Sequence, residues 1–124
     1  MSNTCKSGSY NKYLLQYHLI FVCKYRRKLL VSSNISSDIK KRLSLEYCQI
    51  HNVIIHYIEV DKDHIHYMVE TTPNINLSNM VRTMKSYITY HILEKYSAYL
   101  SKCFWKEKTF FSDGYFICSI DNVS

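Results

Sequence analysis

Residues 52–70 read NVIIHYIEVDKDHIHYMVE and have the pattern of a β-hairpin. The first nine of them, 52–60, are rich in β-branched residues, which is typical of a strand. The charged DKD that follows, 61–63, predicts a tight polar turn. The stretch HIHYMVE, 64–70, then predicts a returning antiparallel strand.

Two elements precede this hairpin. YLLQYHLIFVCKY, residues 13–25, is apolar at nearly every position, which predicts a strand at the centre of a sheet, buried on both faces. Residues 32–51 predict a helix, with Ser36 or Ser37 as its N-cap and Asp38 in its first turn. Its apolar residues recur at helical spacing: Ile39, Leu43, Tyr47 and Ile50.

Two more elements follow the hairpin. After Pro73, Asn76 can cap a long second helix whose wet face carries Arg82 and Lys85. GYFICSI, residues 114–120, predicts a last strand. The helix has one apolar stripe, formed by Leu77, Met80, Val81, Met84, Ile88 and Ile92. The order strand, helix, strand, strand, helix, strand predicts an α+β, ferredoxin-like βαββαβ fold: a four-stranded antiparallel sheet with both helices on one face.

Length and composition predict a single domain spanning residues 1–124. The formal net charge of +6 favours a polyanionic partner. The number of cysteines, five, is odd and they form no Cys-x-x-Cys pair, so we expect reduced thiols in a cytoplasmic protein. No apolar run approaches the roughly 20 residues that span a bilayer, so no membrane partner is expected. Two glycines cannot build a Gly-rich phosphate loop.

His64 and His66 stand one residue apart on the predicted strand 64–70. Side chains alternate across a strand, so the two imidazoles point to the same face, about 6.8 Å apart along the chain. Two such imidazoles can share one divalent ion whose other positions stay open to water or a phosphate oxygen. Pairs like this also occur as ordinary polar residues of exposed strands, and both interpretations stay open. The opposite face carries Ile65, Tyr67 and Val69, which can pack on the helices.

The other histidines and the nearby acids have simpler interpretations. His18, in the central strand, is either a satisfied core histidine or a neighbour of the pair. The other histidines are interpreted as ordinary residues of helices and strands: His51, His56 and His91. The acids Glu59, Asp61 and Asp63 are interpreted as hairpin-turn residues, although any of them could supply an oxygen to a hard cation.

The basic cluster KYRRK follows the predicted central strand and consists of Lys24, Tyr25, Arg26, Arg27 and Lys28. One interpretation is a solvated turn. The other is a nucleic-acid contact, because cations interleaved with an aromatic ring suit unpaired strands. We refer to these five residues as the basic segment.

Four stretches occur in the order that characterises one family: YHLIFVCKYRRKLL (17–30), VDKDHIHYMVE (60–70), MVRTMKSYIT (80–89) and FFSDGYFICSI (110–120). Together they resemble the TnpA-type HUH single-tyrosine transposases of bacterial and archaeal insertion sequences, where HUH denotes His, a bulky hydrophobe and His. The resemblance runs from about Tyr13 to Ser124.

The resemblance implies a DNA transposase that forms a homodimer and recognises subterminal hairpins at the ends of its element. It would cut single-stranded DNA with a tyrosine nucleophile, leaving a 5'-phosphotyrosine linkage and a free 3' hydroxyl. His64 and His66 would hold Mg²⁺ or Mn²⁺, and no nucleotide cofactor is implied. The DNA-binding residues expected are the basic segment, Lys24, Tyr25, Arg26, Arg27 and Lys28, together with Arg82 and Lys85.

One departure from the family concerns the nucleophile. In the family, the tyrosine and a glutamine that completes the metal site lie on a helix after the last strand, whereas here the sequence ends at SIDNVS, 119–124. We therefore expect the nucleophile beyond Ser124, and expect this 124-residue form to bind DNA but to cleave it poorly. The alternative is that one of the twelve tyrosines present is the nucleophile.

Three other functions are compatible with the residues. The first is a non-catalytic single-stranded nucleic-acid-binding module of ferredoxin-like fold, which would read its ligand with a tyrosine-studded sheet. The second is a metal-dependent nuclease without a covalent intermediate, and the third is a purely structural partner protein.

Overall fold

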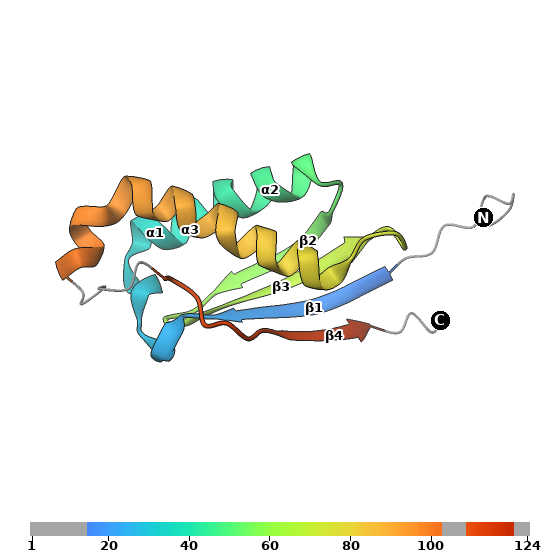
Figure 1. The fold of residues 1–124 in the computed structure, drawn as a ribbon, viewed down its shortest axis with the longest axis horizontal. Coiled ribbons are helices and arrows are strands. Elements are labelled where there is room, and N and C mark those ends of the chain that lie inside the picture. Colours follow the sequence, from blue (N-terminus) through green and yellow to red (C-terminus); the bar gives the residue numbers. More distant parts are fainter. Residues whose placement is uncertain (1–14, 103–108, 121–124) are drawn as a thin grey trace, which may run out of the picture.

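The structure is a computed structural model that describes residues 15–102 and 109–120. Its strands form one antiparallel sheet in the order β2-β3-β1-β4, with the helices along one side (Figure 1). This arrangement confirms the predicted ferredoxin-like fold. The elements are β1 (Leu15–Val22), α1 (Ser33–Asp38), α2 (Ser44–Ile50), β2 (Ile54–Val60), β3 (His64–Thr71), α3 (Leu77–Lys102) and β4 (Phe116–Ile120).

The predicted hairpin is present as β2 and β3. The backbone N–H of Asp61 donates to the carbonyl of His64 at 2.9 Å and closes the turn. Along β3, Ile65, Tyr67 and Val69 are fully buried, whereas His64 and His66 between them are partly exposed. The period-2 alternation read from the sequence is therefore confirmed.

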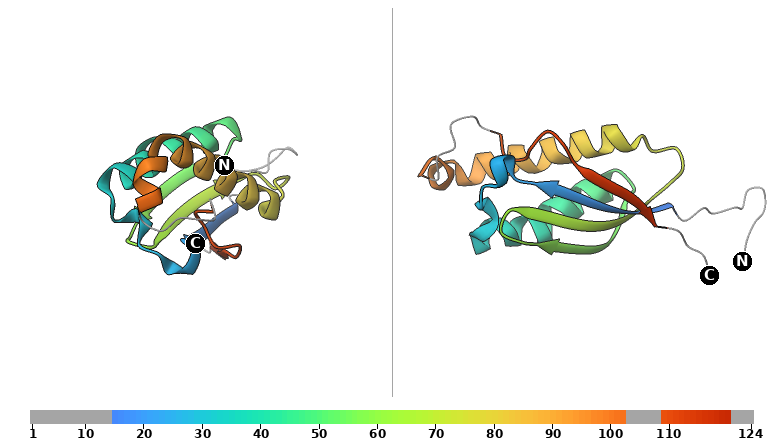
Figure 2. Two further views of the ribbon diagram at one scale, coloured as in Figure 1. Left: turned by 60° about the vertical axis from the view of Figure 1, so that its left-hand side comes forward. Right: turned by 90° about the horizontal axis from the view of Figure 1, so that it is seen from below.

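The central strand ends earlier and is more open than predicted, and residues 13 and 14 of the predicted strand lie outside the described residues. β1 pairs with both β3 and β4, so its central position is confirmed. It ends at Val22, however, and the expected burial on both faces is wrong. Leu19 and Phe21 are fully buried toward the helices, whereas His18 and Ile20 are partly exposed on the other face. No described helix covers that face, which is turned toward the viewer in the view from below in Figure 2. We call it the open face.

The first helical region also differs from the prediction. It begins at Ser33, and the hydroxyl of Ser32 accepts the backbone N–H of Ile35 at 3.4 Å, so neither Ser36 nor Ser37 is the cap. The Ser36 hydroxyl instead donates to the carbonyl of Leu30. A π-helical turn, Ile39–Leu43, joins α1 to α2. Of the predicted apolar residues, Ile39, Leu43 and Tyr47 are buried, but Ile50 is 66% exposed because it lies on the last turn.

Asp38 lies at the end of α1 and not in the first helical turn. Its carboxylate accepts a hydrogen bond from the Nζ of Lys95 at 2.9 Å and another from the Tyr96 hydroxyl. Burial alone would raise the pKa of Asp38, but these two bonds and the charges of Lys95 and Arg42 lower it. Asp38 therefore fastens the first helical region to α3.

The second helix follows the prediction closely. The Asn76 side chain accepts the backbone N–H of Asn79 at 3.0 Å, which confirms the N-cap. Leu77 is partly buried against the core. The rest of the predicted stripe is buried against the sheet: Met80, Val81, Met84, Ile88 and Ile92.

Cys23 and Cys48 are buried free thiols, and burial raises the pKa of each to about 12. Cys118 is free and exposed, while Cys5 and Cys103 lie outside the described residues. The reduced state of the five cysteines stays a prediction. Within residues 15–102 and 109–120, no helix is long and apolar enough to cross a membrane.

Candidate metal and nucleic-acid site

His64 and His66 lie on the open face at one end of the sheet, where their partners on β1 are Val22 and Ile20. The His64 side chain is 34% exposed, and its Nδ1 lies 3.0 Å from Oδ1 of Asp63. An ionised carboxylate can only accept, so Nδ1 of His64 carries the proton of this bond. In the neutral ring, the Nε2 atom of His64 then keeps its lone pair.

His66 is surrounded by other polar and aromatic side chains. Its Nε2 lies 3.0 Å from Nδ1 of His18, and the two ring centroids are 5.1 Å apart. The ring of Tyr57 meets His66 edge-on at 5.8 Å, and Glu59 pairs with His66 across the strands. The prediction that His18 neighbours the pair is confirmed. In the tautomer in which Nε2 of His66 donates to Nδ1 of His18, Nδ1 of His66 keeps the lone pair that a metal would need.

The described residues supply only part of a metal site. Among residues 15–102 and 109–120, no group of three or more His, Cys, Asp or Glu side chains could hold a metal ion. His64 and His66 offer two nitrogen ligands, which suit Mn²⁺ better than Mg²⁺, since Mg²⁺ prefers oxygen. A divalent cation held by this pair would need further ligands from water, phosphate oxygen or groups outside the described residues.

The residues that flank the basic segment are hydrogen-bonded to the hairpin turn that precedes His64. The backbone N–H of Cys23 donates to the carbonyl of Asp63 at 2.8 Å, and that of Leu30 donates to the carbonyl of Lys62 at 3.0 Å. Two consecutive residues of the segment, Tyr25 and Arg26, have left-handed backbones with φ of 58° and 54°. The structure therefore brings the predicted basic segment and the histidine pair to the same end of the sheet.

The side chains of the basic segment form a cluster in which Tyr25, Arg26 and Lys28 are exposed and Lys24 and Arg27 are partly exposed. The ring of Tyr25, which is 65% exposed, has the Nζ of Lys24 and the guanidinium of Arg27 each 5.5 Å from its centroid. Arg26 is 71% exposed and forms an ion pair with Asp63 at 3.1 Å through its Nε. Lys28 is exposed. Cations that flank an exposed ring are the arrangement expected for binding an unpaired strand.

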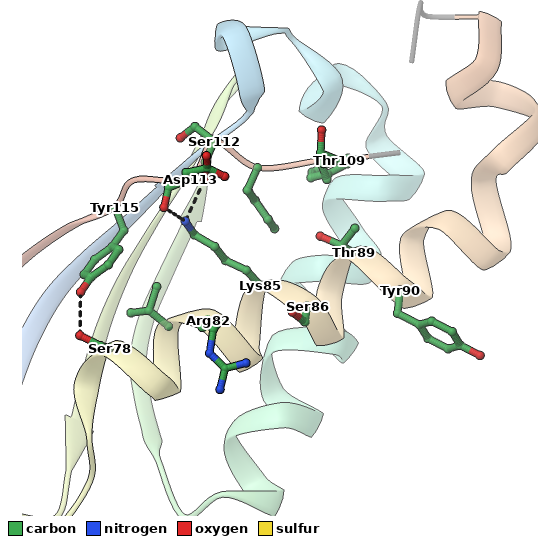
Figure 3. Close-up of a pocket in the computed structure, with 13 residues that line it drawn as sticks. Ser78, Arg82, Lys85, Ser86, Thr89, Tyr90, Thr109, Ser112, Asp113 and Tyr115 are labelled. Atoms are coloured by element: carbon green, nitrogen blue, oxygen red, sulfur yellow. Dashed lines mark hydrogen bonds between the residues drawn. The ribbon is translucent and has the colours of Figure 1, made fainter. Parts of the chain in front are cut away.

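Arg82 and Lys85 are not part of this cluster, because α3 lies on the helix side of the sheet. Arg82 is exposed and contacts Asn79 of its own helix. Lys85 was predicted on the wet face, and this placement is wrong: its Nζ donates to the carbonyls of Ser112 at 2.9 Å and Gly114 at 2.8 Å (Figure 3). Burial lowers the pKa of Lys85, and the nearby charge of Asp113 opposes that shift. Their DNA-binding role stays a prediction.

A pocket of about 570 Å³ lies beside Lys85, between α3 and residues 109–115 (Figure 3). Its buried apolar part consists of Val81, Phe110 and Phe111. At one end, Ser78 and Tyr115 join their hydroxyls at 3.3 Å. The lining includes no residue of the histidine pair or the basic segment, so the pocket is not part of the candidate metal site.

We expect Lys85→Met to lower the free energy of unfolding by about 1–2 kcal/mol, because three backbone carbonyls before β4 lose a charged donor. Arg82→Met is the matched control on the same helix, with an expected change within about 0.5 kcal/mol. Urea denaturation of both variants measures the difference. Equal stabilities would mean that Lys85 does not hold this segment.

The fold, the histidine pair and the adjacent basic segment together define a ferredoxin-like domain with a His-hydrophobe-His motif on its open face. The family model "Transposase IS200 like" matches residues 11–124. The chain therefore belongs to the family of IS200-like transposases.

Curated relatives agree with this assignment. The chain is 25% identical over 118 residues to the transposase of insertion sequence IS200 from Salmonella typhimurium, covering 93% of this chain and 73% of the relative. It is 30% identical over 80 residues to the ISDra2 transposase TnpA of Deinococcus radiodurans, covering 64% of this chain and 56% of that protein.

Two solved structures show the same fold. A candidate transposase of Deinococcus radiodurans superposes with a TM-score of 0.80 at 21% identity, covering 95% of this chain and 88% of its own. A REP-associated tyrosine transposase, solved with a REP hairpin, superposes with a TM-score of 0.59 at 15% identity. That match covers 99% of this chain and 64% of the other.

Proposed function

We propose that the protein is a DNA transposase that cuts and rejoins single-stranded DNA at the ends of an insertion sequence through a 5'-phosphotyrosine intermediate. The observation that carries the proposal is the placement of His64 and His66 on the open face, beside the exposed basic segment. The family assignment supports the general activity. Action on cellular DNA would place the protein in the cytoplasm.

His64 and His66 would hold Mg²⁺ or Mn²⁺ in this proposal. When bound, such an ion supplies Lewis-acid activation of a phosphodiester. Residues of the chain would bind and orient the DNA. The cations of the basic segment would hold the DNA backbone next to the histidine pair, and the exposed ring of Tyr25 would stack on an unpaired base. This arrangement of cations and an exposed ring at one end of the sheet suits single-stranded DNA.

The described tyrosine that touches the histidine pair is Tyr57, and its environment does not suit a nucleophile. Its hydroxyl donates to the carboxylate of Glu59 at 3.1 Å, and this bond raises the pKa of Tyr57. A raised pKa leaves less of the nucleophilic phenolate at neutral pH. We therefore propose that Tyr57 is not the nucleophile and that, as the family resemblance implies, a tyrosine and a further metal ligand outside the described residues complete the site.

A hairpin at the element end and a second copy of the chain are the proposed partners. The REP-associated relative was solved with a REP hairpin, which supports a hairpin ligand here. Within the described sheet, β2 and β4 each pair on one side, so each leaves an edge at which a second copy could add.

The test uses a labelled single-stranded oligonucleotide that carries an insertion-sequence end with its hairpin, incubated with the 124-residue protein and Mn²⁺. We expect a shifted complex on a native gel, and we expect Tyr57→Phe to give the same complex, and the same amount of covalent adduct on a denaturing gel, as the unchanged protein. Absence of any complex would refute DNA recognition. An efficient adduct that Tyr57→Phe abolishes would place the nucleophile on β2 and refute the proposal that Tyr57 is not the nucleophile.

A non-catalytic single-strand-binding module is the second candidate, because the described residues supply two metal ligands and not three. This candidate predicts that hairpin binding is the same with Mn²⁺ and with a chelator, for the unchanged protein and for the double variant His64→Ala, His66→Ala. The transposase proposal predicts that Mn²⁺ strengthens binding of the unchanged protein and that the double variant loses this effect.

A further inference from the structure

Asp63 joins the histidine pair to the basic segment. Its Oδ1 lies 3.0 Å from Nδ1 of His64, and its Oδ2 lies 3.1 Å from Nε of Arg26. The side chain is 17% exposed, so both oxygens are used within a largely covered position. The hydrogen bond from His64, together with the bond from Arg26 and both charges, lowers the pKa of Asp63 although desolvation opposes the shift. The sequence interpretation of Asp63 as an ordinary turn residue is therefore incomplete.

The bond to Asp63 determines which nitrogen of His64 faces a ligand. A carboxylate accepts the proton of Nδ1, so Nε2 is the atom left with a lone pair. It also fixes the rotation of the ring about the Cβ–Cγ bond. Carboxylates that hold metal-binding histidines in this way typically change metal affinity by about 10–100-fold when they are removed.

Arg26 reaches Asp63 through an unusual backbone conformation. Left-handed φ values cost a non-glycine residue about 1–2 kcal/mol, and Tyr25 and Arg26 both adopt them. The segment is held there by hydrogen bonds, including that from the backbone N–H of Arg26 to the carbonyl of Cys23 at 2.9 Å. This turn directs Nε inward to Asp63, while the side chain as a whole is 71% exposed.

We infer that Asp63 is a positioning residue that fixes the tautomer and orientation of His64, and that Arg26 holds Asp63 in place from the basic segment. The inference rests on the proposed function for the role of His64 in binding a metal. Its structural part, the control of the His64 tautomer, stands without any metal. The basic segment and the candidate metal site are then joined by one set of contacts, which runs from Arg26 through Asp63 to His64.

The first test is a long-range ¹H–¹⁵N NMR correlation of the metal-free protein at about pH 8, above the ordinary pKa of histidine of about 6.5. The His64 signals are identified by their loss in His64→Ala. We expect the proton on Nδ1 in the unchanged protein and in Asp61→Ala, a control that removes an equal charge from the same turn. In Asp63→Ala, we expect the proton to move to Nε2, the position that free imidazole side chains favour. An unchanged Nδ1–H in Asp63→Ala would overturn the inference.

The second test measures Mn²⁺ affinity by calorimetry in the same variants. We expect Asp63→Ala to bind Mn²⁺ about 10–100-fold more weakly and Asp61→Ala to differ by less than about 3-fold. Asp63→Asn should recover part of the loss, because its amide oxygen can still accept the Nδ1 proton. Equal losses in Asp61→Ala and Asp63→Ala would reduce the effect to general charge and overturn the inference.

The two tests separate failure of this inference from failure of the proposed function. If His64→Ala leaves Mn²⁺ affinity unchanged, the metal role of His64 is wrong, whatever Asp63 does. If His64→Ala weakens binding but Asp63→Ala does not, the metal role stands and the positioning role is wrong. Arg26→Met should reproduce the Asp63→Ala changes in the same direction and to a smaller extent, because Asp63 keeps its bond to His64. If Arg26→Met leaves both the His64 tautomer and the Mn²⁺ affinity unchanged, Arg26 does not hold Asp63 in place.

Discussion

Replacing Lys24, Arg27 and Lys28 together by glutamine should weaken binding of single-stranded DNA on the order of 100-fold at about 50 mM salt. Each lost phosphate contact lowers the slope of log affinity against log salt by about 0.7, so we expect the slope to fall by about 2. Arg26 is kept, because its bond to Asp63 would add a second effect. Fluorescence anisotropy with a labelled hairpin oligonucleotide over a salt series gives both quantities.

The matched control for this triple variant replaces Lys40, Lys41 and Lys102 by glutamine. These three lysines are exposed on the helical regions, and their loss lowers the formal net charge of +6 by the same three units. We expect the control to keep nearly all of its affinity and slope. If both triple variants lose the same affinity, the attraction comes from net charge alone and the basic segment is not a specific contact surface.

The hairpin and the second helix could be predicted from sequence because each rests on a local pattern. Alternation along residues 64–70 separates the buried Ile65, Tyr67 and Val69 from the histidines, and the structure preserves it. In the second helix, the Asn76 cap and the apolar stripe are also local. Neither prediction needs knowledge of a distant residue.

The central strand shows where a local pattern misleads. Its apolar run predicted burial on both faces, but Ile20 and Val22 point to the open face and are only partly covered. The central place of β1 comes instead from pairing at both edges, with β3 and with β4. A continuous apolar run cannot distinguish these two cases.

The start of the first helix depends on tertiary packing. Residues 32–37 contain four serines, any of which can cap a helix. Leu29 and Leu30 are buried just before them, and Ile35 is fully buried inside the first turn. Docking of these three residues fixes the start at Ser33, which the serines themselves could not reveal.

The histidine pair and the basic segment of the candidate site could be predicted from the sequence, but the contacts that hold them in place could not. The histidine pair and the basic segment follow from alternation and composition. The contacts of His66 with His18 and of Lys85 with Ser112 join residues 48 and 27 positions apart, so they depend on strand register and helix docking. The position of Asp63 against Arg26 depends on the left-handed backbone of Tyr25 and Arg26, which the sequence did not indicate because neither residue is a glycine. The one available signal was a carboxylate directly before the histidine pair.

The most direct measurement is a Mn²⁺ titration of the 124-residue protein, followed by electron paramagnetic resonance of the free ion. We expect binding of the unchanged protein, and a loss of affinity of at least about 10-fold in His64→Ala and in His66→Ala, since each removes one of two protein ligands. His56→Ala is the control, because His56 lies on the neighbouring β2 and bonds Glu70 at 2.9 Å. Equal Mn²⁺ affinity in all four proteins would contradict a shared cation between His64 and His66.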